Sequence, residues 1–243
     1  MSKIIIVMIV CLSILLGIGI YGRLNTNIDT HEKEEIVSTV APSSTPVATP
    51  TPVPTYDTTS LDSLLLLANK THALPSDYEP SDLVLPEVRG DKDGLYLREE
   101  AAKAIEELFN AATNDGVNLL LVSAYRSYSY QETLFNGYVN RDGLAEAEIK
   151  SSRPGHSDHQ TGLAADICRD GCRLNATFAD TTEGQWLANN AHKYGFIMRY
   201  PKGKEDITGY MYEPWHFRYI GKEEAQKVYD SGLCFEEYYN VLD

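Results

Sequence analysis

The stretch SSRPGHSDHQTGLAAD, residues 151–166, brings two histidines and two aspartates close together along the chain. Its last residue, Asp166, ends the small apolar run Leu163-Ala164-Ala165, a pattern that predicts a buried position. A buried carboxylate is costly unless it is paired with a cation or bound to a metal ion. The stretch therefore predicts that Asp166 has a cation as its partner.

A second group of titratable residues, EPWH at residues 213–216, lies in a strongly aromatic part of the sequence. Glu213 precedes His216 by three positions, but Pro214 cannot lie inside a helix and pushes Glu213 towards an extended conformation. This excludes the helical arrangement of the H-E-x-x-H zinc proteases. We expect Glu213 and His216 on a strand, at a bend.

His159, Asp166 and His216 together supply two imidazoles and one carboxylate. This donor set suits one Zn²⁺ ion and leaves a fourth position for water, whose pKa the metal lowers from 15.7 to about 7. Glu213 is placed to accept the proton of the water and pass it to a leaving amine. Arg126, which follows a predicted buried strand, is the best candidate for stabilising the oxyanion. These residues predict amide hydrolysis.

The surrounding residues, 56–243, have the composition of one folded domain. Apolar positions recur at helical spacing between Arg98 and Ala112, and Asp180 followed by Glu183 predicts a capping box for another helix. Strands and helices in irregular order predict an α+β domain with a mostly antiparallel sheet flanked by helices. The other expected elements are a short apolar helix or strand at 61–67, strands at 117–123, 196–200 and 212–219, a helix from about 128, and a last helix at 222–230.

Residues 1–23 read as a membrane anchor, because no charge occurs between Lys3 and Arg23. As a helix, residues 4–20 would rise roughly 26 Å, close to the bilayer's hydrocarbon thickness of about 30 Å. A cleaved signal peptide is the alternative, although no small-x-small cleavage site follows Gly22.

Residues 24–55 are expected to form an extracellular linker. Residues 41–55, APSSTPVATPTPVPT, contain five prolines and no charge, a composition that prefers extended, semi-rigid conformations. We therefore expect a single-pass protein of the cell membrane, with its catalytic domain, residues 56–243, outside the cell.

The composition narrows the range of partners. With 35 acidic and 21 basic residues the net charge is −14, so a nucleic acid would be repelled by the average face of the protein. Nucleic acid is accordingly not an expected partner. Four cysteines in 243 residues cannot form the framework of the fold.

Four motifs occur in a fixed order, and together they resemble the zinc D-alanyl-D-alanine carboxypeptidases of the VanY type. They are SAYRSYSYQ at residues 123–131, SxHxxGxAxD at 157–166, YGFIMRYP at 194–201 and EPWHFRYIG, which contains ExxH, at 213–221. The resemblance covers most of the predicted domain. It implies a fold like that of the zinc domain of hedgehog.

The resemblance also implies roles for individual residues. Positions matching His159, Asp166 and His216 bind zinc in that family, and the position matching Glu213 is the general base. Arg126 matches the arginine that stabilises the transition state. Gln131 and Ser157 match substrate-binding positions. The implied substrate is a peptidoglycan stem peptide, from which a D,D-carboxypeptidase releases the terminal D-alanine.

Three other functions remain open at this point. An L,D-carboxypeptidase would act on tetrapeptide stems, which also end in D-alanine. A wall-binding module could retain zinc without turnover. A non-haem iron oxygenase uses two histidines and one carboxylate as well, but would leave Glu213 and Arg126 without roles.

One feature departs from the family pattern. Cys168 and Cys172 follow Asp166 in the sequence DICRDGC. Outside the cell we expect them to form a local disulfide that stiffens the loop beside the metal, with two free thiols, or pairing with Cys234, as the alternatives.

Overall fold

The computed structural model describes residues 55–242. The expected anchor, residues 1–23, and almost the whole expected linker, residues 24–55, lie outside this range. Within it, no helix combines the length and the hydropathy that crossing a bilayer would require.

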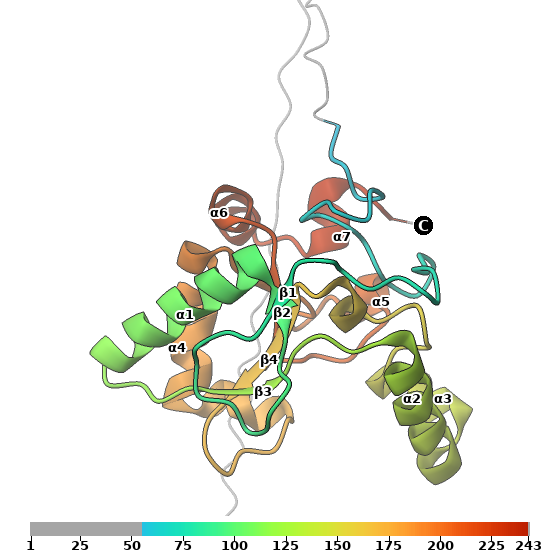
Figure 1. Cartoon of the computed structure of the whole chain (residues 1–243), viewed down its shortest axis with the longest axis horizontal. Helices are drawn as coiled ribbons and strands as arrows, with labels where there is room; N and C mark the ends of the chain where they lie inside the picture. The colour runs from blue at the N-terminus through green and yellow to red at the C-terminus, as the bar shows by residue number, and fades with distance from the viewer. Residues whose placement is uncertain (1–54, 243) are drawn as a thin grey trace, which may run out of the picture. The chain divides into compact units, whose positions relative to one another are not determined.

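A four-stranded antiparallel sheet with the strand order β3-β4-β6-β5 forms the centre of the domain. Figure 1 labels two of its strands, β3 and β4. Its strands are β3 (Leu120–Ser123), β4 (Ala164–Cys168), β5 (Phe196–Met198) and β6 (His216–Tyr219). A separate antiparallel pair consists of β1 (Leu83–Val84) and β2 (Leu97–Arg98). The α+β class and the antiparallel sheet predicted from the sequence are confirmed.

Helices surround this sheet. Figure 1 shows α2 and α3 side by side at one end of the domain, with α1 and α4 at the other end. The α-helices are α1 (Glu99–Asn114), α2 (Tyr128–Asp142), α3 (Leu144–Lys150), α4 (Thr182–Asn190), α5 (Glu205–Thr208), α6 (Lys222–Ser231) and α7 (Phe235–Tyr239). The short 3₁₀ helices are η1 (Asp158–Thr161), η2 (Ala176–Asp180) and η3 (Ala191–Tyr194).

The two faces of the sheet differ in chemistry because successive side chains of a strand point to opposite faces. Ala165 and Ile167 of β4 and Phe217 of β6 belong to the main hydrophobic core, together with the apolar side of α1 and residues of α4. Asp166 of β4 lies opposite His216 of β6 in the strand register. The other face of the same strands therefore carries polar side chains.

Several predicted elements are confirmed with altered limits. The predicted helix between residues 98 and 112 is α1, and the last predicted helix is α6. The strands are shorter than predicted; β6, for example, begins only at His216, after the turn that contains Pro214. The capping box of Asp180 was wrong: Thr181 is the N-cap residue of α4, and its side chain accepts from the Gly184 N–H.

Two other differences concern whole elements. Residues 61–67 form turns instead of the predicted helix or strand, because their buried members pack on two separate apolar clusters. Helix α7 was not predicted, because it has only 5 residues and its two buried apolar residues, Phe235 and Tyr239, are too few to show a helical period. The predicted disulfide between Cys168 and Cys172 is present, and Cys234 is a free, buried thiol.

Candidate metal centre

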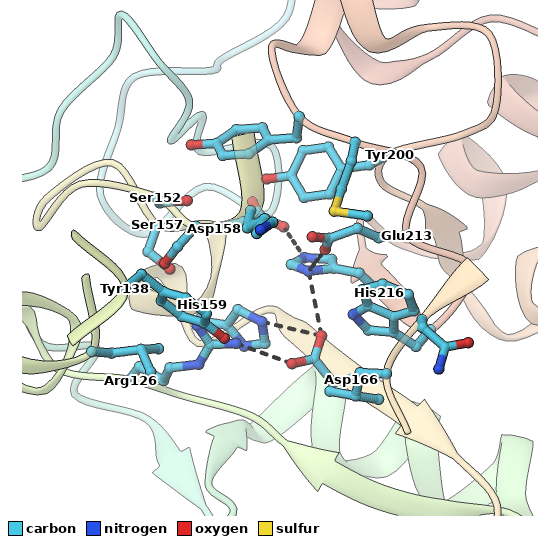
Figure 2. Close-up of a pocket in the computed structure, with 18 of the residues that line it drawn as sticks. Arg126, Tyr138, Ser152, Ser157, Asp158, His159, Asp166, Tyr200, Glu213 and His216 are labelled. Carbon is cyan, nitrogen blue, oxygen red and sulfur yellow. Dashed lines mark hydrogen bonds and ion pairs between the residues drawn. The ribbon is translucent and has the colours of Figure 1, made fainter. Parts of the chain in front are cut away.

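Three chain segments bring the predicted metal ligands together on the polar face of the sheet. Asp166 and His216 are paired across β4 and β6, and His159 lies on η1, just before β4. One ligand atom from each of the three lies within 4.8 Å of the others. Figure 2 shows the three side chains converging, with Glu213 beside His216.

Three potential ligand atoms lie close together at the centre. His159 Nε2 lies 3.3 Å from Asp166 Oδ1, and His216 Nδ1 lies 3.4 Å from the same oxygen. Among residues 55–242, neither His159 Nε2 nor Asp166 Oδ1 has a hydrogen-bond partner, although both atoms are buried. Because buried polar atoms are nearly always paired, the cluster fits a metal ion held by two imidazoles and one carboxylate.

Neighbouring groups fix the orientation of His159 and Asp166. His159 Nδ1 donates to the carbonyl oxygen of Ala124 at 2.7 Å, so Nε2 is left as an acceptor towards the centre. Asp166 Oδ2 accepts a hydrogen bond from Arg126 at 3.0 Å, which leaves Oδ1 for the centre. Both residues thus present one free lone pair to the same point.

The two histidines differ in proton affinity. Burial, reinforced by the positive charge of Arg126, lowers the pKa of His159 to about 4. Burial would also lower the pKa of His216, but hydrogen bonds with Asp158 and Glu213 outweigh it and raise that pKa to about 9. Since neutral imidazole is the metal-binding form, His159 is ready to bind at neutral pH, whereas His216 releases a proton.

Glu213 lies beside the centre, in the turn before β6. Its Oε2 atom is 3.3 Å from His216 Nδ1, and its backbone N–H donates to the carbonyl oxygen of Tyr200. Only 8% of Glu213 is exposed, and burial raises the pKa of its carboxyl group above the ordinary value. A carboxylate whose pKa is raised towards neutrality is suited to accept and release a proton.

Arg126 is held by three contacts at the edge of the centre. Its Nε, Nη1 and Nη2 atoms donate to Ser123, Gln131 and Asp166 at 3.0–3.1 Å. An arginine has five N–H groups, so two remain for a substrate, and the side chain lines the pocket. Gln131 was predicted to contact the substrate, but it is 0% exposed and is not among the residues that line the pocket. Its side chain lies behind Arg126, from which it accepts a hydrogen bond, and it donates to the backbone oxygen of Ser152.

A pocket of about 400 Å³ opens over these residues, between the polar face of the sheet and helix α2. Ser157, which is predicted to bind substrate, is among the residues that line it. His156 does not line it: the Nδ1 atom of its ring lies 2.7 Å from the carbonyl oxygen of Asn69. Residues of the wall that sequence reasoning did not single out include Tyr138, Asp158, Tyr200, Tyr210, Met211 and, near the disulfide loop, Leu174 and Asn175.

The signals for these residues were weak. Asp158 was visible as an acidic residue between two histidines, but nothing in the sequence indicated what it contacts. The tyrosines belong to a set of sixteen in the chain, so composition alone did not distinguish those in the pocket.

Comparison with known proteins shows which protein family this chain resembles. The sequence profile of the VanY family, described as D-alanyl-D-alanine carboxypeptidase, matches residues 94–222, more than half of the chain. The chain belongs to the VanY family. YodJ of Bacillus subtilis (strain 168) is 48% identical over 187 residues, which cover 74% of this chain and 68% of YodJ.

Solved structures agree with the VanY fold. The LdcB LD-carboxypeptidase is 48% identical with a TM-score of 0.69, covering 73% of this chain and 86% of LdcB. A mutant of the vancomycin-resistance D,D-pentapeptidase VanY in complex with Zn(II) is 35% identical with a TM-score of 0.60, covering 72% of this chain and 98% of that chain. The hedgehog-like peptidase fold predicted from the motifs is confirmed.

Zinc is therefore the cofactor of this VanY-family carboxypeptidase. The donor set of the buried cluster suits this ion, and a structural relative contains it. The same donor set would also suit non-haem iron, but the family match and the zinc-containing relative both support a zinc peptidase and not an oxygenase.

Proposed function

We propose that the protein is a zinc D,D-carboxypeptidase, which hydrolyses the last peptide bond of peptidoglycan stem peptides and releases D-alanine. The observation that carries this proposal is the buried convergence of His159, Asp166 and His216 beside Glu213, at the base of a pocket large enough for a peptide end. Membership of the VanY family supports the substrate class.

In this proposal His159, Asp166 and His216 would hold the zinc ion, which would supply Lewis acidity towards water and the scissile carbonyl. Glu213 accepts a proton from the attacking water at a carboxylate oxygen and delivers it to the leaving amine. Its burial keeps this carboxylate away from bulk water and raises its proton affinity.

Arg126 and Ser157 act on the substrate. Arg126 lines the pocket, and two of its five N–H groups donate no hydrogen bond within residues 55–242. These groups and the fixed positive charge are available to stabilise the negative charge that develops on the carbonyl oxygen. Gln131 keeps that guanidinium in place from behind. Ser157 offers a hydroxyl to the peptide from the pocket wall.

An L,D-carboxypeptidase activity is the second candidate. The observation in its favour is the 48% identity with LdcB, which exceeds the 35% identity with the VanY D,D-pentapeptidase. Both activities need the same zinc cluster and the same base, because both substrates end in D-alanine. The two substrates differ only in the residue that precedes the terminal D-alanine.

A direct test offers the zinc-loaded protein three substrates: a pentapeptide stem ending in D-Ala-D-Ala, a tetrapeptide stem ending in an L-centre diamino acid and D-Ala, and an acyl-D-Ala-D-Lac ester. We expect D-alanine release from the pentapeptide, and none from the Glu213→Gln variant. Release from the tetrapeptide alone would establish the L,D activity instead. No release from any of them, with zinc bound, would leave the non-catalytic wall-binding module.

We also propose that residues 1–23 anchor the protein in the cell membrane and that residues 24–55 hold the domain of residues 56–243 outside the cell. The support is the uncharged stretch between Lys3 and Arg23 and the five prolines of residues 41–55. Replacement of residues 1–23 by a cleaved signal peptide should keep the protein exported and release it from the membrane fraction into the medium. A protein that stays bound to the wall without them would contradict this proposal.

A further inference from the structure

Asp158 is a charged residue in the interior that the catalytic proposal leaves without a role. It is only 1% exposed and lies on η1, next to His159 in the sequence. Its Oδ1 atom accepts a hydrogen bond from Arg218, and Arg199 Nε lies 3.9 Å from the same oxygen. Its Oδ2 atom lies 3.3 Å from His216 Nε2 (Figure 2).

His216 therefore has a different kind of neighbour at each ring nitrogen. Nδ1 faces the centre, 3.4 Å from Asp166 Oδ1, while Nε2 faces Asp158. A metal binds the unprotonated nitrogen of a neutral imidazole, so Nε2 must carry the proton if Nδ1 is to bind. A carboxylate can only accept a hydrogen bond, and Asp158 thus favours the tautomer with the proton on Nε2.

We propose that Asp158 is a positioning residue of the zinc site: it fixes the ring orientation and the tautomer of His216, so that Nδ1 presents its lone pair to the metal. The proposal rests on the zinc site proposed above. It assigns to Asp158 for His216 the part that the carbonyl oxygen of Ala124 plays for His159.

The surroundings of Asp158 prevent its carboxylate from turning away. Arg218 is held in place by the backbone oxygens of Leu64, Leu66 and Tyr219 in addition to Asp158. Arg199 is held by two hydrogen bonds to Glu236 of α7.

The charges of this buried group balance, with two guanidinium groups against the carboxylates of Asp158 and Glu236. The cost of burying Asp158 is thereby offset within the group. The second ligand histidine is thus oriented by a charged network that extends to the C-terminal helix.

The substitution Asp158→Asn gives a sharp test because an amide is nearly the same shape but has one donor and one acceptor end. Arg218 donates to the Oδ1 position and favours the amide oxygen there. The amide nitrogen would then face His216 Nε2 and donate to it, which favours the proton on Nδ1. That tautomer cannot bind the metal through Nδ1.

The experiment measures zinc affinity by competition with a chelator in the purified full chain, together with the tautomer of His216 by ¹⁵N NMR in the metal-free protein above pH 9, where this imidazole is neutral. We expect the proton on Nε2 in the wild type, and zinc affinity about 10- to 100-fold weaker in Asp158→Asn. Glu236→Gln is the matched control. It disturbs the same buried network through Arg199 without touching His216, and it should retain zinc affinity within about threefold.

Two outcomes would overturn the proposal. One is a wild-type spectrum with the His216 proton on Nδ1, a result that needs no variant and holds even if Asp158→Asn fails to fold. The other is a folded Asp158→Asn protein that binds zinc as tightly as the wild type. Failure of the proposed function would look different, since the wild type itself would then bind no zinc or bind it without cleaving stem peptides.

Discussion

The two faces of β4 and β6 show how one pair of strands serves two purposes. Ile167 and Phe217 face the hydrophobic core, whereas Asp166 and His216, their immediate neighbours in sequence, face the candidate zinc site. Packing on the apolar face holds the strands rigid, and the register then sets the distance between the polar side chains. Stability thus comes from one face and chemistry from the other. Substitutions on the apolar face should therefore change the free energy of unfolding, and substitutions on the polar face should change activity.

The largest effect on the polar face is expected for Glu213→Gln. The variant keeps the shape of the side chain but cannot accept a proton, and kcat should fall about 10²- to 10⁴-fold with zinc retained. Measurement of D-alanine release at saturating zinc checks this. Activity within threefold of the wild type would remove Glu213 from its role as general base.

Arg126→Lys should have the next largest effect on activity. A lysine keeps the charge but cannot contact Ser123, Gln131 and Asp166 at once, so the charge is no longer fixed over the pocket. We expect kcat to fall about 10²-fold, with KM changing less. An unchanged kcat with a raised KM would mean that Arg126 binds the substrate without stabilising the transition state.

On the apolar face, Ile167→Ala should act on stability. Ile167 is fully buried, and its truncation should lower the free energy of unfolding by about 2–5 kcal/mol. Below its melting temperature the variant should keep kcat/KM within about threefold, because the side chain points away from the pocket. Urea unfolding and peptide hydrolysis on the same sample separate the two effects, and a joint loss would show that the faces are not independent.

The smallest effect concerns the pH dependence of stability in the metal-free protein. Burial raises the pKa of Glu213 in the folded state, so the ionised carboxylate destabilises that state relative to the unfolded chain. The stability advantage of Glu213→Gln over the wild type should therefore grow as the pH rises from 4.5 to the raised pKa, and then stay constant. An advantage that shrinks with rising pH would contradict the direction of this shift.

The convergence of His159, Asp166 and His216 could be predicted because these residue types, which have strict geometric demands as metal ligands, lie in recognisable motifs, and the structure brings the three side chains together. Helix α1 could be predicted because apolar residues recur there with a helical period. Sequence reasoning missed the role of Asp158, since the contacts of that side chain with Arg199, His216 and Arg218 join residues far apart in the chain.

Local competition explains two other errors. Asp180 and Thr181 are both capable N-cap residues, and only the backbone conformation decides that Thr181 accepts the hydrogen bond. Gln131 was expected on the pocket wall, but its amide is used entirely inside, between Arg126 and the Ser151–Ser152 segment. Neither outcome can be read from residue type or spacing.

The most direct test of the central claim is an anomalous difference map, collected at the zinc absorption edge, from crystals of the zinc-loaded protein. We expect one peak per chain, bounded by His159 Nε2, Asp166 Oδ1 and His216 Nδ1, with Glu213 beside it and not among its ligands. A peak held by other residues, or no peak in this pocket, would contradict it.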